Sequence, residues 1–275
     1  MLKKVTKITK GFTHGGKFHA DDVFGAALLS IVFPGIKIER GFKVPENYEG
    51  IVFDIGYGEF DHHQADKEVR ENGIPYAAFG LLWRKFGTSL LSEEKAQIFD
   101  EKFVQAIDLA DNSAERNELS TVIASFNPSW NEEVDSDECF MQAMNFAKEI
   151  LQRRFRYYKD EELAEGIVEA ELAKSEDDIL VLPRFVPWKS KVLETDVKFV
   201  VFPSLRGGYN AQAVPISEEN PELRISFPEE WRGKTPEELK RIVDGMTFCH
   251  SGGFLIAADK LDTVIKACKM AMENH

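Results

Sequence analysis

Apolar residues recur at alternating or helical spacing along the first part of the chain, and they predict a series of strands and helices. Short apolar runs of this kind suit the buried strands of an α/β sheet. The predicted elements are strands over 5–13, 36–42 and 50–55 and helices over 21–32, 76–86 and 93–110. This order of elements predicts an α/β fold whose N-terminal domain has a parallel-rich sheet flanked by helices.

The second part of the chain begins with a loop over 127–137 that contains proline, asparagine and aspartate. A helix over 140–151, with an extension to 156 left open, and a separate helix over 161–174 come next. The remaining predicted elements are strands over 178–182, 197–202, 212–215, 224–227 and 246–249 and helices over 236–243 and 257–272. We place the domain boundary near Ser175. It gives a first domain over 1–175 and a smaller α+β domain over 176–275, with a cleft between them.

The chain has 275 residues, and 34 Lys and Arg against 47 Asp and Glu give it a net charge of −13. This balance excludes a generally basic nucleic-acid coat, but it leaves room for a local basic groove or a metal site. Three widely spaced cysteines without a CxxC pair argue against a zinc ribbon and fit a reducing cytoplasm. Neither a signal peptide nor a membrane-spanning stretch is recognisable. We therefore expect a cytoplasmic protein with no membrane partner.

Four of the six histidines lie in the first quarter of the chain, each close to aspartate or glycine. Several aspartates lie beside these histidines or in nearby stretches. Most of these residues follow predicted strands, in THGGKFHADD, GIVFDI and FDHH, and AIDLADN ends a predicted helix. These stretches carry His14, His19, Asp21, Asp22, Asp54, Asp61, His62, His63, Asp108 and Asp111. Because loops beyond the carboxyl ends of parallel strands converge on one crevice, the side chains can meet in space.

Mixed imidazole and carboxylate ligands suit borderline divalent metals such as Mn²⁺, Fe²⁺ or Zn²⁺. The ligands are too many for one tetrahedral zinc and suit two metals that share a bridging carboxylate. A metal pair about 3.5–4 Å apart is the usual arrangement for in-line attack on a phosphate ester. Each cluster alone has an ordinary explanation, such as acidic residues in a first helical turn or a histidine pair in a solvated loop. Their coincidence in one region favours a metal site.

A further cluster, CHSGGF at 249–254, lies between a predicted strand and the helix expected from 257. Glycines before a helix N-terminus can present backbone N–H groups to an anion. Arg224 and Arg232 offer bidentate contacts to a phosphate. The alternative is a plain turn with a capping serine.

Seven stretches of the chain resemble the DHH phosphoesterase superfamily and, more closely, the melanocyte-proliferating-gene family of metal-dependent 3′–5′ exonucleases. They are THGGKFHADD, VFDIGYGEFDHHQ, IPYAAFGLLW, AIDLADN, YNAQAVP, PEEWRGKTPEEL and FCHSGGFLIAA. The resemblance extends from residue 13 to about residue 257, and FDHHQ with the upstream H-x4-H-x-D is its most specific part.

This resemblance implies a DHH-type N-terminal domain that binds two divalent ions, Mn²⁺ or Mg²⁺, and a smaller domain that grips the substrate. The residues that match the family's motifs are His14, His19 and Asp21 in the first, Asp54 in the second, Asp61, His62 and His63 in the third, Asp108 or, preferably, Asp111 in the fourth, and His250, Ser251, Gly252 and Gly253 in the smaller domain. The chain departs from the superfamily in two places. A histidine occupies the middle of the first motif, and Tyr57 stands where a further glycine is more usual.

We therefore expect a metal-dependent phosphoesterase that hydrolyses phosphodiester bonds, acting as a 3′–5′ exonuclease on short or single-stranded RNA or DNA. Asp54 would bridge two metals, His62 or His63 would protonate the leaving group, and Arg224 would position the phosphate. The bulk acidity favours nucleic-acid ends or nucleotides over long duplexes. The alternatives are a nucleotide phosphatase or pyrophosphatase and a non-enzymatic module that binds metal and nucleotide. A homodimer is left open.

Overall fold

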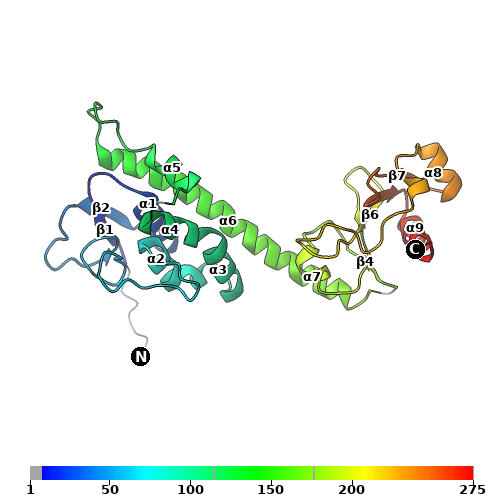
Figure 1. The fold of residues 1–275 in the computed structure, drawn as a ribbon, viewed down its shortest axis with the longest axis horizontal. Helices are drawn as coiled ribbons and strands as arrows, with labels where there is room; N and C mark the ends of the chain where they lie inside the picture. The colour runs from blue at the N-terminus through cyan, green and yellow to red at the C-terminus, as the bar shows by residue number, and fades with distance from the viewer. Residues whose placement is uncertain (1–7, 114, 176, 275) are drawn as a thin grey trace. The chain divides into compact units, whose positions relative to one another are not determined.

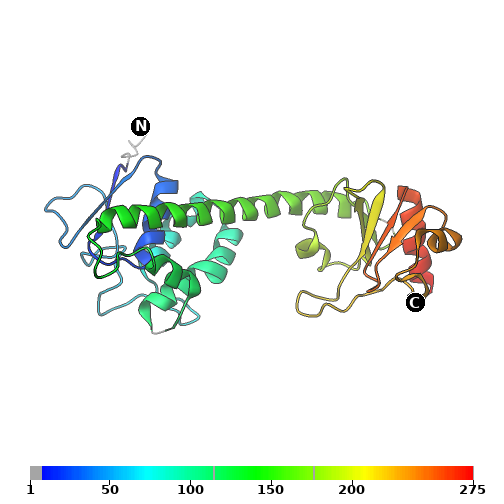
Figure 2. The ribbon, with the colours of Figure 1, turned by 90° about the horizontal axis from the view of Figure 1, so that it is seen from above.

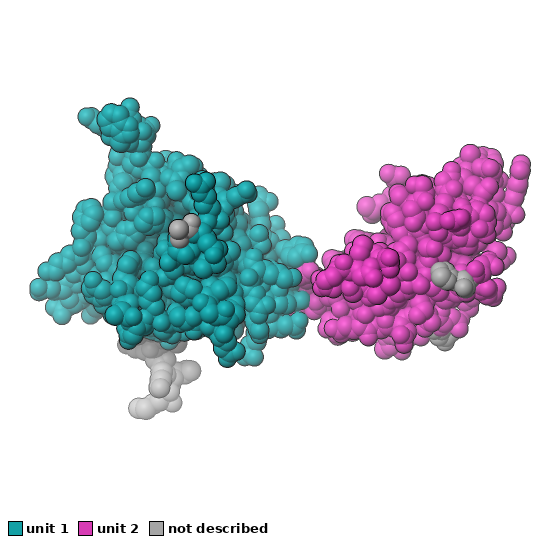
Figure 3. Space-filling view, viewed as in Figure 1, with its two compact units in different colours: residues 1–159 teal, residues 160–275 magenta. Residues whose placement is uncertain are grey.

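The computed structural model describes residues 8–113, 115–175 and 177–274. The chain divides into two compact units, residues 1–159 and 160–275, which Figure 3 shows in teal and magenta. The predicted boundary near Ser175 lies just beyond a long helix, whereas the two units divide within that helix. The mixed α/β class is confirmed. The DHH-type assignment and the cleft between two domains stay predictions.

The sheet of the first unit has three parallel strands in the order β2-β1-β3, and Figure 1 labels β1 and β2. They are β1 (Lys10–His14), β2 (Lys37–Gly41) and β3 (Ile51–Val52). β3 is shorter than the predicted strand over 50–55, and Asp54 just beyond it takes a left-handed φ of 55° that is incompatible with a regular strand. Residues 5–7 of the first predicted strand lie outside the described residues. The parallel order brings the carboxyl ends of β1 and β3 to the same edge.

Helices supply most of the core of the first unit. In chain order they are α1 (Ala20–Val32), α2 (Ala78–Phe86), the 3₁₀ turn η1 (Gly87–Ser89), α3 (Glu93–Phe99), the π-helical turn η2 (Asp100–Val104), α4 (Gln105–Asn112) and α5 (Glu118–Ala124). α1 packs against β1, α2, α4 and α5, with Val23 and Phe24 fully buried. The predicted helices over 21–32 and 76–86 are confirmed. The predicted helix over 93–110 contains the π turn, a feature that often lies beside functional residues.

One helix, α6 (Ser136–Leu172), occupies the stretch for which the sequence predicts two helices. Figure 2 shows it as one continuous ribbon. Phe140 and Leu151 are buried in the core of the first unit, and Val168 is buried in an apolar cluster of the second. The predicted break after residue 156 is therefore wrong. Lys and Glu are good helix formers, so the charged stretch between the two buried parts stays helical without an apolar face to mark it.

The second unit is built on a five-stranded mixed sheet in the order β4-β5-β6-β8-β7, in which only β4 and β5 run parallel. Its elements are β4 (Ile179–Val181), α7 (Lys189–Val192), β5 (Phe199–Pro203), β6 (Tyr209–Ala213), the 3₁₀ turn η3 (Glu229–Trp231), α8 (Pro236–Ile242), β7 (Met246–Cys249), β8 (Leu255–Ala258) and α9 (Leu261–Glu273). α9 packs against β5, β6 and β8. Among the described residues, no helix combines the length and apolarity needed to cross a bilayer.

One element predicted for the second unit is wrong, and another begins later than predicted. Residues 224–227 form no strand, and the helix expected from 257 begins at Leu261 after the strand β8. Leu and Ala in LIAA favour a helix locally, but pairing with β6 and β7 holds them extended. The CHSGGF stretch is therefore the turn of a β-hairpin, and it does not precede a helix N-terminus.

Candidate metal centre

Two loops at the edge of the parallel sheet meet because their strands are neighbours. His14 is the last residue of β1, and Asp54 follows β3 after one further residue. Asp54 has a left-handed φ of 55°, which costs free energy in most residues and is tolerated best by Asn, Asp and Gly. The turn directs its carboxylate towards the end of β1 instead of along the strand. Adjacent parallel strands thus place a histidine and an aspartate within contact distance.

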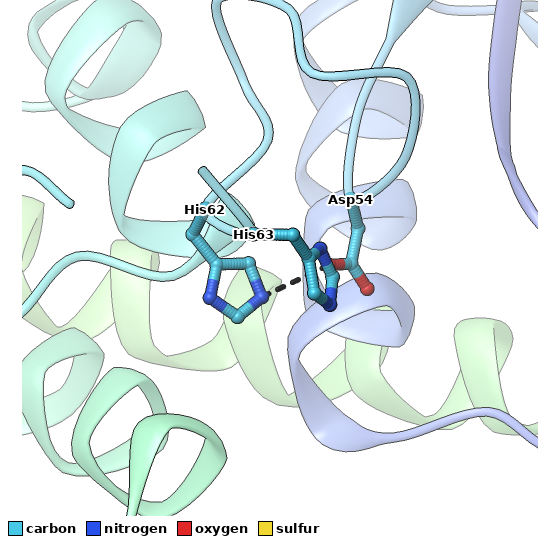
Figure 4. Close-up of side chains that lie close together, drawn as sticks. All are labelled: Asp54, His62 and His63. Atoms are coloured by element: carbon cyan, nitrogen blue, oxygen red, sulfur yellow. Dashed lines mark hydrogen bonds and ion pairs between the residues drawn. The ribbon is translucent and has the colours of Figure 1, made fainter. Parts of the chain in front are cut away.

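The two oxygens of Asp54 contact different histidines. Oδ2 lies 3.3 Å from Nε2 of His14, and Oδ1 lies 3.0 Å from Nε2 of His62, the contact dashed in Figure 4. Burial alone would raise the pKa of Asp54, but hydrogen bonds and positive charge from His14 and His62 outweigh burial and lower it to about 2. One carboxylate therefore joins two imidazoles, which is the geometry that a bridging ligand needs.

Three further carboxylates surround this pair. Oδ2 of Asp22 lies 3.3 Å from Nε2 of His14, while Oδ2 of Asp111 and Oδ2 of Asp21 lie 3.3 and 3.8 Å from Nε2 of His62. Three sets of side chains consequently have ligand atoms within 4.8 Å of one another, and Asp54 and His62 each belong to two of them. The sets are His14–Asp22–Asp54, Asp54–His62–His63 and Asp21–His62–Asp111.

The electrostatics of these carboxylates fit divalent cations. Asp21 and Asp22 are fully buried, and Oδ2 of Asp22 accepts no hydrogen bond within the described part of the chain. Burial raises the pKa of Asp22 to about 7, and burial together with the charges of Asp54 and Asp111 raises the pKa of Asp21. Buried carboxylate oxygens usually accept hydrogen bonds, so an oxygen that accepts none and lies beside a histidine nitrogen fits a site for a cation. The mixed nitrogen and oxygen donors can bind a metal ion, as expected.

Two predicted ligands, His19 and Asp61, lie nearby without joining these sets. His19 lines the same pocket, with its ring 6.1 Å from that of His14. Both oxygens of Asp61 accept hydrogen bonds within its own loop: Oδ2 from the backbone N–H of Tyr57 at 2.6 Å, and Oδ1 from the backbone N–H of His63 at 3.2 Å. Oδ1 of Asp61 also lies 2.7 Å from Nδ1 of His63. Asp61 therefore shapes the loop that presents the two histidines.

The structure distinguishes Asp108 from Asp111, which the sequence left as alternatives. Asp108 is fully buried, and its oxygens accept hydrogen bonds from Arg70 Nη2 at 2.8 Å and from the backbone N–H of Gly80 at 3.0 Å. A Cβ on Gly80 would lie 1.8 Å from Asp108 Oδ2, so glycine is required for this approach. Asp111, one helical turn later on α4, lies beside His62 instead. Asp111 thus belongs to one of the three sets that could bind a metal ion, whereas the oxygens of Asp108 are bonded to Arg70 and Gly80.

Asn112 orients His62, and the sequence analysis missed it. Its Nδ2 donates to the carbonyls of Tyr76 and Asp108 at 3.1 and 3.0 Å, which turns Oδ1 towards Nδ1 of His62 at 3.4 Å. With Nδ1–H donated to Asn112, Nε2 of His62 faces Asp54, to which its N–H donates at 3.0 Å, and loss of that proton would free Nε2 for a metal ion. The signal was available in AIDLADN, where an amide directly follows the ligand candidate. Asp22 was also left unassigned, because acidic residues are common in a first helical turn.

Two side chains hold the loop that follows His14. Arg40 on β2 donates from Nη2 to the carbonyl of Gly16 at 2.8 Å and from Nη1 to Asp137 at the start of α6 at 2.6 Å. Its guanidinium also lies 4.3 Å from the ring centre of Phe140. Asn127 bonds both the N–H and the carbonyl of Phe18, at 3.0 and 2.9 Å. These contacts fix the backbone that positions His14 although both partners lie far away in the sequence.

The centre opens into a pocket of about 1040 Å³. Asp54, Asp61, Asp111 and the histidines lie in its wall. The wall also includes Lys17, Phe42, Lys43, Val44, Tyr57 and Lys67. Such a volume is in the range of small-molecule and cofactor sites. The pocket is formed entirely by the first unit.

Comparison with known proteins identifies the family. The profile of the MYG1 exonuclease family, described as an uncharacterised protein family (UPF0160), matches residues 10–272. The chain belongs to this family. The MYG1 protein of Dictyostelium discoideum is 29% identical, with 88% of this chain and 90% of that protein aligned. The MYG1 exonuclease of Mus musculus is also 29% identical, with 88% of this chain and 79% of that protein aligned. The MYG1 protein of Saccharomyces cerevisiae is 27% identical, with 98% of each chain aligned. No solved structure matches the chain.

In this member of the MYG1 family, the guanidinium of Arg224 donates to backbone carbonyls. Its Nη1 donates to the carbonyls of Thr195 and Val197, and its Nη2 donates to that of Leu193 at 2.8 Å. The guanidinium thus holds the loop before β5, and few of its donors remain for a phosphate. Phosphate binding by Arg224 stays a prediction without support from this geometry.

The hairpin turn between β7 and β8 contains the other predicted substrate residues of this MYG1 family member. Nδ1 of His250 accepts a hydrogen bond from the N–H of Gly252 at 2.9 Å, and the N–H of Gly253 donates to the carbonyl of His250 at 2.9 Å. Ser251 and Gly252 are exposed in this turn. Gly253 has a φ of 67°, and a Cβ there would lie 2.5 Å from Arg232 Nε. The turn is well ordered by its own bonds, and its part in substrate binding stays a prediction.

Proposed function

We propose that the chain is a metal-dependent phosphodiesterase that acts as a 3′–5′ exonuclease on short or single-stranded RNA or DNA. The observation that carries this proposal is that the two oxygens of Asp54 contact two different histidines, His14 and His62, at the wall of an open pocket. The names of the mammalian relatives, which are MYG1 exonucleases, support the same reaction class. The family supports a nuclease-like function. The proposed attack on the 3′ end of the nucleic acid rests on the resemblance to 3′–5′ exonucleases.

We propose ligands for two cation positions from these donor sets. His14 and Asp22 would hold one cation, and Asp21, His62 and Asp111 would hold the other. Asp54 would contribute one oxygen to each. When bound, two divalent cations, Mn²⁺ or Mg²⁺, activate a water for attack on phosphorus and stabilise the charge that develops on the phosphate.

His63 is placed to handle the proton of the leaving group. Its Nδ1 lies 2.7 Å from Oδ1 of Asp61, and 56% of its side chain is exposed at the pocket. A carboxylate at Nδ1 fixes the ring orientation and leaves Nε2 for the substrate. His62, in contrast, is buried and directed at Asp54. We therefore assign proton donation to His63 and cation binding to His62.

A paired substrate assay tests this proposal. Purified protein with Mn²⁺ should shorten end-labelled single-stranded oligonucleotides from the 3′ end and should act more slowly on mononucleotides and pyrophosphate. Asp54→Asn keeps the shape and tolerates the left-handed backbone, and it should lower the rate by at least about a hundredfold. Equal activity of Asp54→Asn and wild type, with both folded by circular dichroism, would refute the proposal. Preference for mononucleotides would favour the phosphatase alternative.

A further inference from the structure

Tyr57 has a strained backbone and an exposed ring. Its φ is 58°, in the left-handed region that residues other than Gly, Asn and Asp rarely adopt, and its side chain is 75% exposed. Asp61 stabilises this backbone conformation, because its Oδ2 accepts a hydrogen bond from the backbone N–H of Tyr57 at 2.6 Å. Burial of the aromatic ring does not offset this strain. Such an unfavourable residue at the wall of a functional pocket suggests a role for the ring itself.

Phe42 is a second exposed ring at the same pocket. It is 86% exposed and directly follows β2. A Cβ on Gly16 would lie 3.2 Å from Phe42 Cε1, so the ring leans on the backbone just beyond His14. Two residues later, Val44 packs close to Gly56 in the Asp54 loop. The segment from Phe42 to Val44 is therefore seated on both loops of the metal centre.

Three lysines line the pocket with these two rings, in addition to the aspartates of the metal centre. Lys17 and Lys43 line the pocket with Phe42 and Tyr57, and neither lysine forms an ion pair with any described residue. Lys67 lies at the same wall, with Nζ 3.0 Å from Oδ1 of Asn112. In a chain with a net charge of −13, unpaired lysines beside exposed aromatic rings are complementary to a ligand that has both phosphates and flat bases.

We propose that Phe42 and Tyr57 stack on the terminal base of a single-stranded nucleic acid, with Lys17 and Lys43 binding the adjoining phosphates. This inference rests on the proposed exonuclease function and names the residues that position its substrate. Phe42 and Tyr57 make no ring contact with each other among the described residues, and both are largely exposed, so each ring can offer a face to a base. Stacking is possible with any base, because every base has a π face. The pocket should therefore bind a terminal base without distinguishing one base from another.

The test compares two oligonucleotides that differ only at the 3′ end, one with a natural terminal nucleotide and one with an abasic terminal nucleotide. Wild type should cleave the natural end about tenfold or more faster in kcat/KM. Tyr57→Ala and Phe42→Ala should each bring this ratio towards one, and Tyr57→Phe should keep it. Trp130→Ala is the matched control. Trp130 is 96% exposed and does not line the pocket, so its loss should leave the ratio unchanged.

A binding measurement keeps this inference separate from the proposed reaction. Stacking of a terminal 2-aminopurine on wild-type protein should quench its fluorescence before any turnover, and Tyr57→Ala should lose the quenching. Absence of quenching in wild type, or an unchanged cleavage ratio in both alanine variants, overturns the base-stacking role. Quenching without hydrolysis of either oligonucleotide counts against the exonuclease proposal and supports the stacking. If the wild-type protein does not bind nucleic acid and Phe42→Ala disrupts a protein complex, the inference is overturned and the two rings contact a protein partner.

Discussion

Nε2 of His62 lies 3.0 Å from Oδ1 of Asp54, close enough for a proton or a metal ion to neutralise the carboxylate. Without metal, positively charged histidine stabilises the negative charge of Asp54. With metal bound, the histidine must be neutral to act as a ligand. Protons and cations therefore compete for the same few atoms, and pH should control both the stability of the metal-free protein and its affinity for metal.

The stability of the metal-free protein should fall as the pH rises from about 6.5 to about 9. Burial acts to lower the pKa of His14, but its hydrogen bond to Asp54 and the charges of Asp22 and Asp54 raise it from 6.5 to about 9. A raised histidine pKa contributes stability that is complete below the unfolded-state pKa and lost as the pH rises through the folded-state value. The loss is on the order of 3 kcal/mol at most.

Asp22 reinforces this trend at lower pH. Burial raises its pKa to about 7 in the folded state, so its ionisation opposes folding increasingly as the pH rises from 3.8 to about 7. Thermal unfolding in EDTA at several pH values measures both effects. Mn²⁺ at pH 8.5 should restore the lost stability, because deprotonated ligands favour metal binding. A Tm that rises with pH in EDTA would contradict the charge assignment.

Asp22 and Asp108 should differ in their effects on metal binding. Asp22→Asn removes the charge of a carboxylate whose Oδ2 accepts no hydrogen bond and lies 3.3 Å from His14 Nε2, so it should lower Mn²⁺ affinity while the fold persists. Asp108→Asn weakens the contacts with Arg70 and Gly80, so it should mainly reduce the free energy of unfolding, by about 2–4 kcal/mol. Isothermal titration with Mn²⁺ and urea unfolding separate the two effects. Equal loss of Mn²⁺ affinity in both variants would return Asp108 to the ligand set.

Asn112→Ala should weaken metal binding about 10- to 100-fold without changing the fold. The substitution removes the acceptor near Nδ1 of His62, so the ring loses the bond that fixes its orientation and tautomer. Titration with Mn²⁺ measures the affinity. Asn131→Ala, at an exposed position of the same unit, is the control and should bind metal as wild type does. An unchanged affinity in Asn112→Ala would show that Asp54 alone orients His62.

Tyr57→Gly should stabilise the protein by about 1 kcal/mol, because glycine adopts a left-handed φ without steric cost. Asn47→Gly is the matched comparison: Asn47 has a φ of 57°, but asparagine tolerates this conformation, so a smaller gain is expected. Urea unfolding gives both values. A more stable Tyr57→Gly that also loses discrimination against an abasic end would mean that the strain is maintained for substrate binding.

Much of the first unit was predictable from the sequence because periodicity and local chemistry agree there. The parallel strands explain why His14 and Asp54 meet, and the sequence pattern contained both. The sequence pattern could not show that the Asp108 carboxylate accepts hydrogen bonds from Arg70 and Gly80, because those contacts depend on tertiary packing. In the second unit, local preference misled for LIAA, which favours a helix but pairs as β8. The sequence also could not show that the guanidinium of Arg224 donates to backbone carbonyls, because those contacts depend on tertiary packing.

Arg40 links the Gly16 carbonyl to Asp137 in the first turn of α6. The first turn of that helix therefore cannot unravel without breaking bonds that also hold the loop after His14. Amide protons at both places should exchange with solvent in one cooperative opening, and a cation on His14 should slow exchange at both. Occupancy of the metal centre would then be measurable at a helix end that contributes no ligand to it.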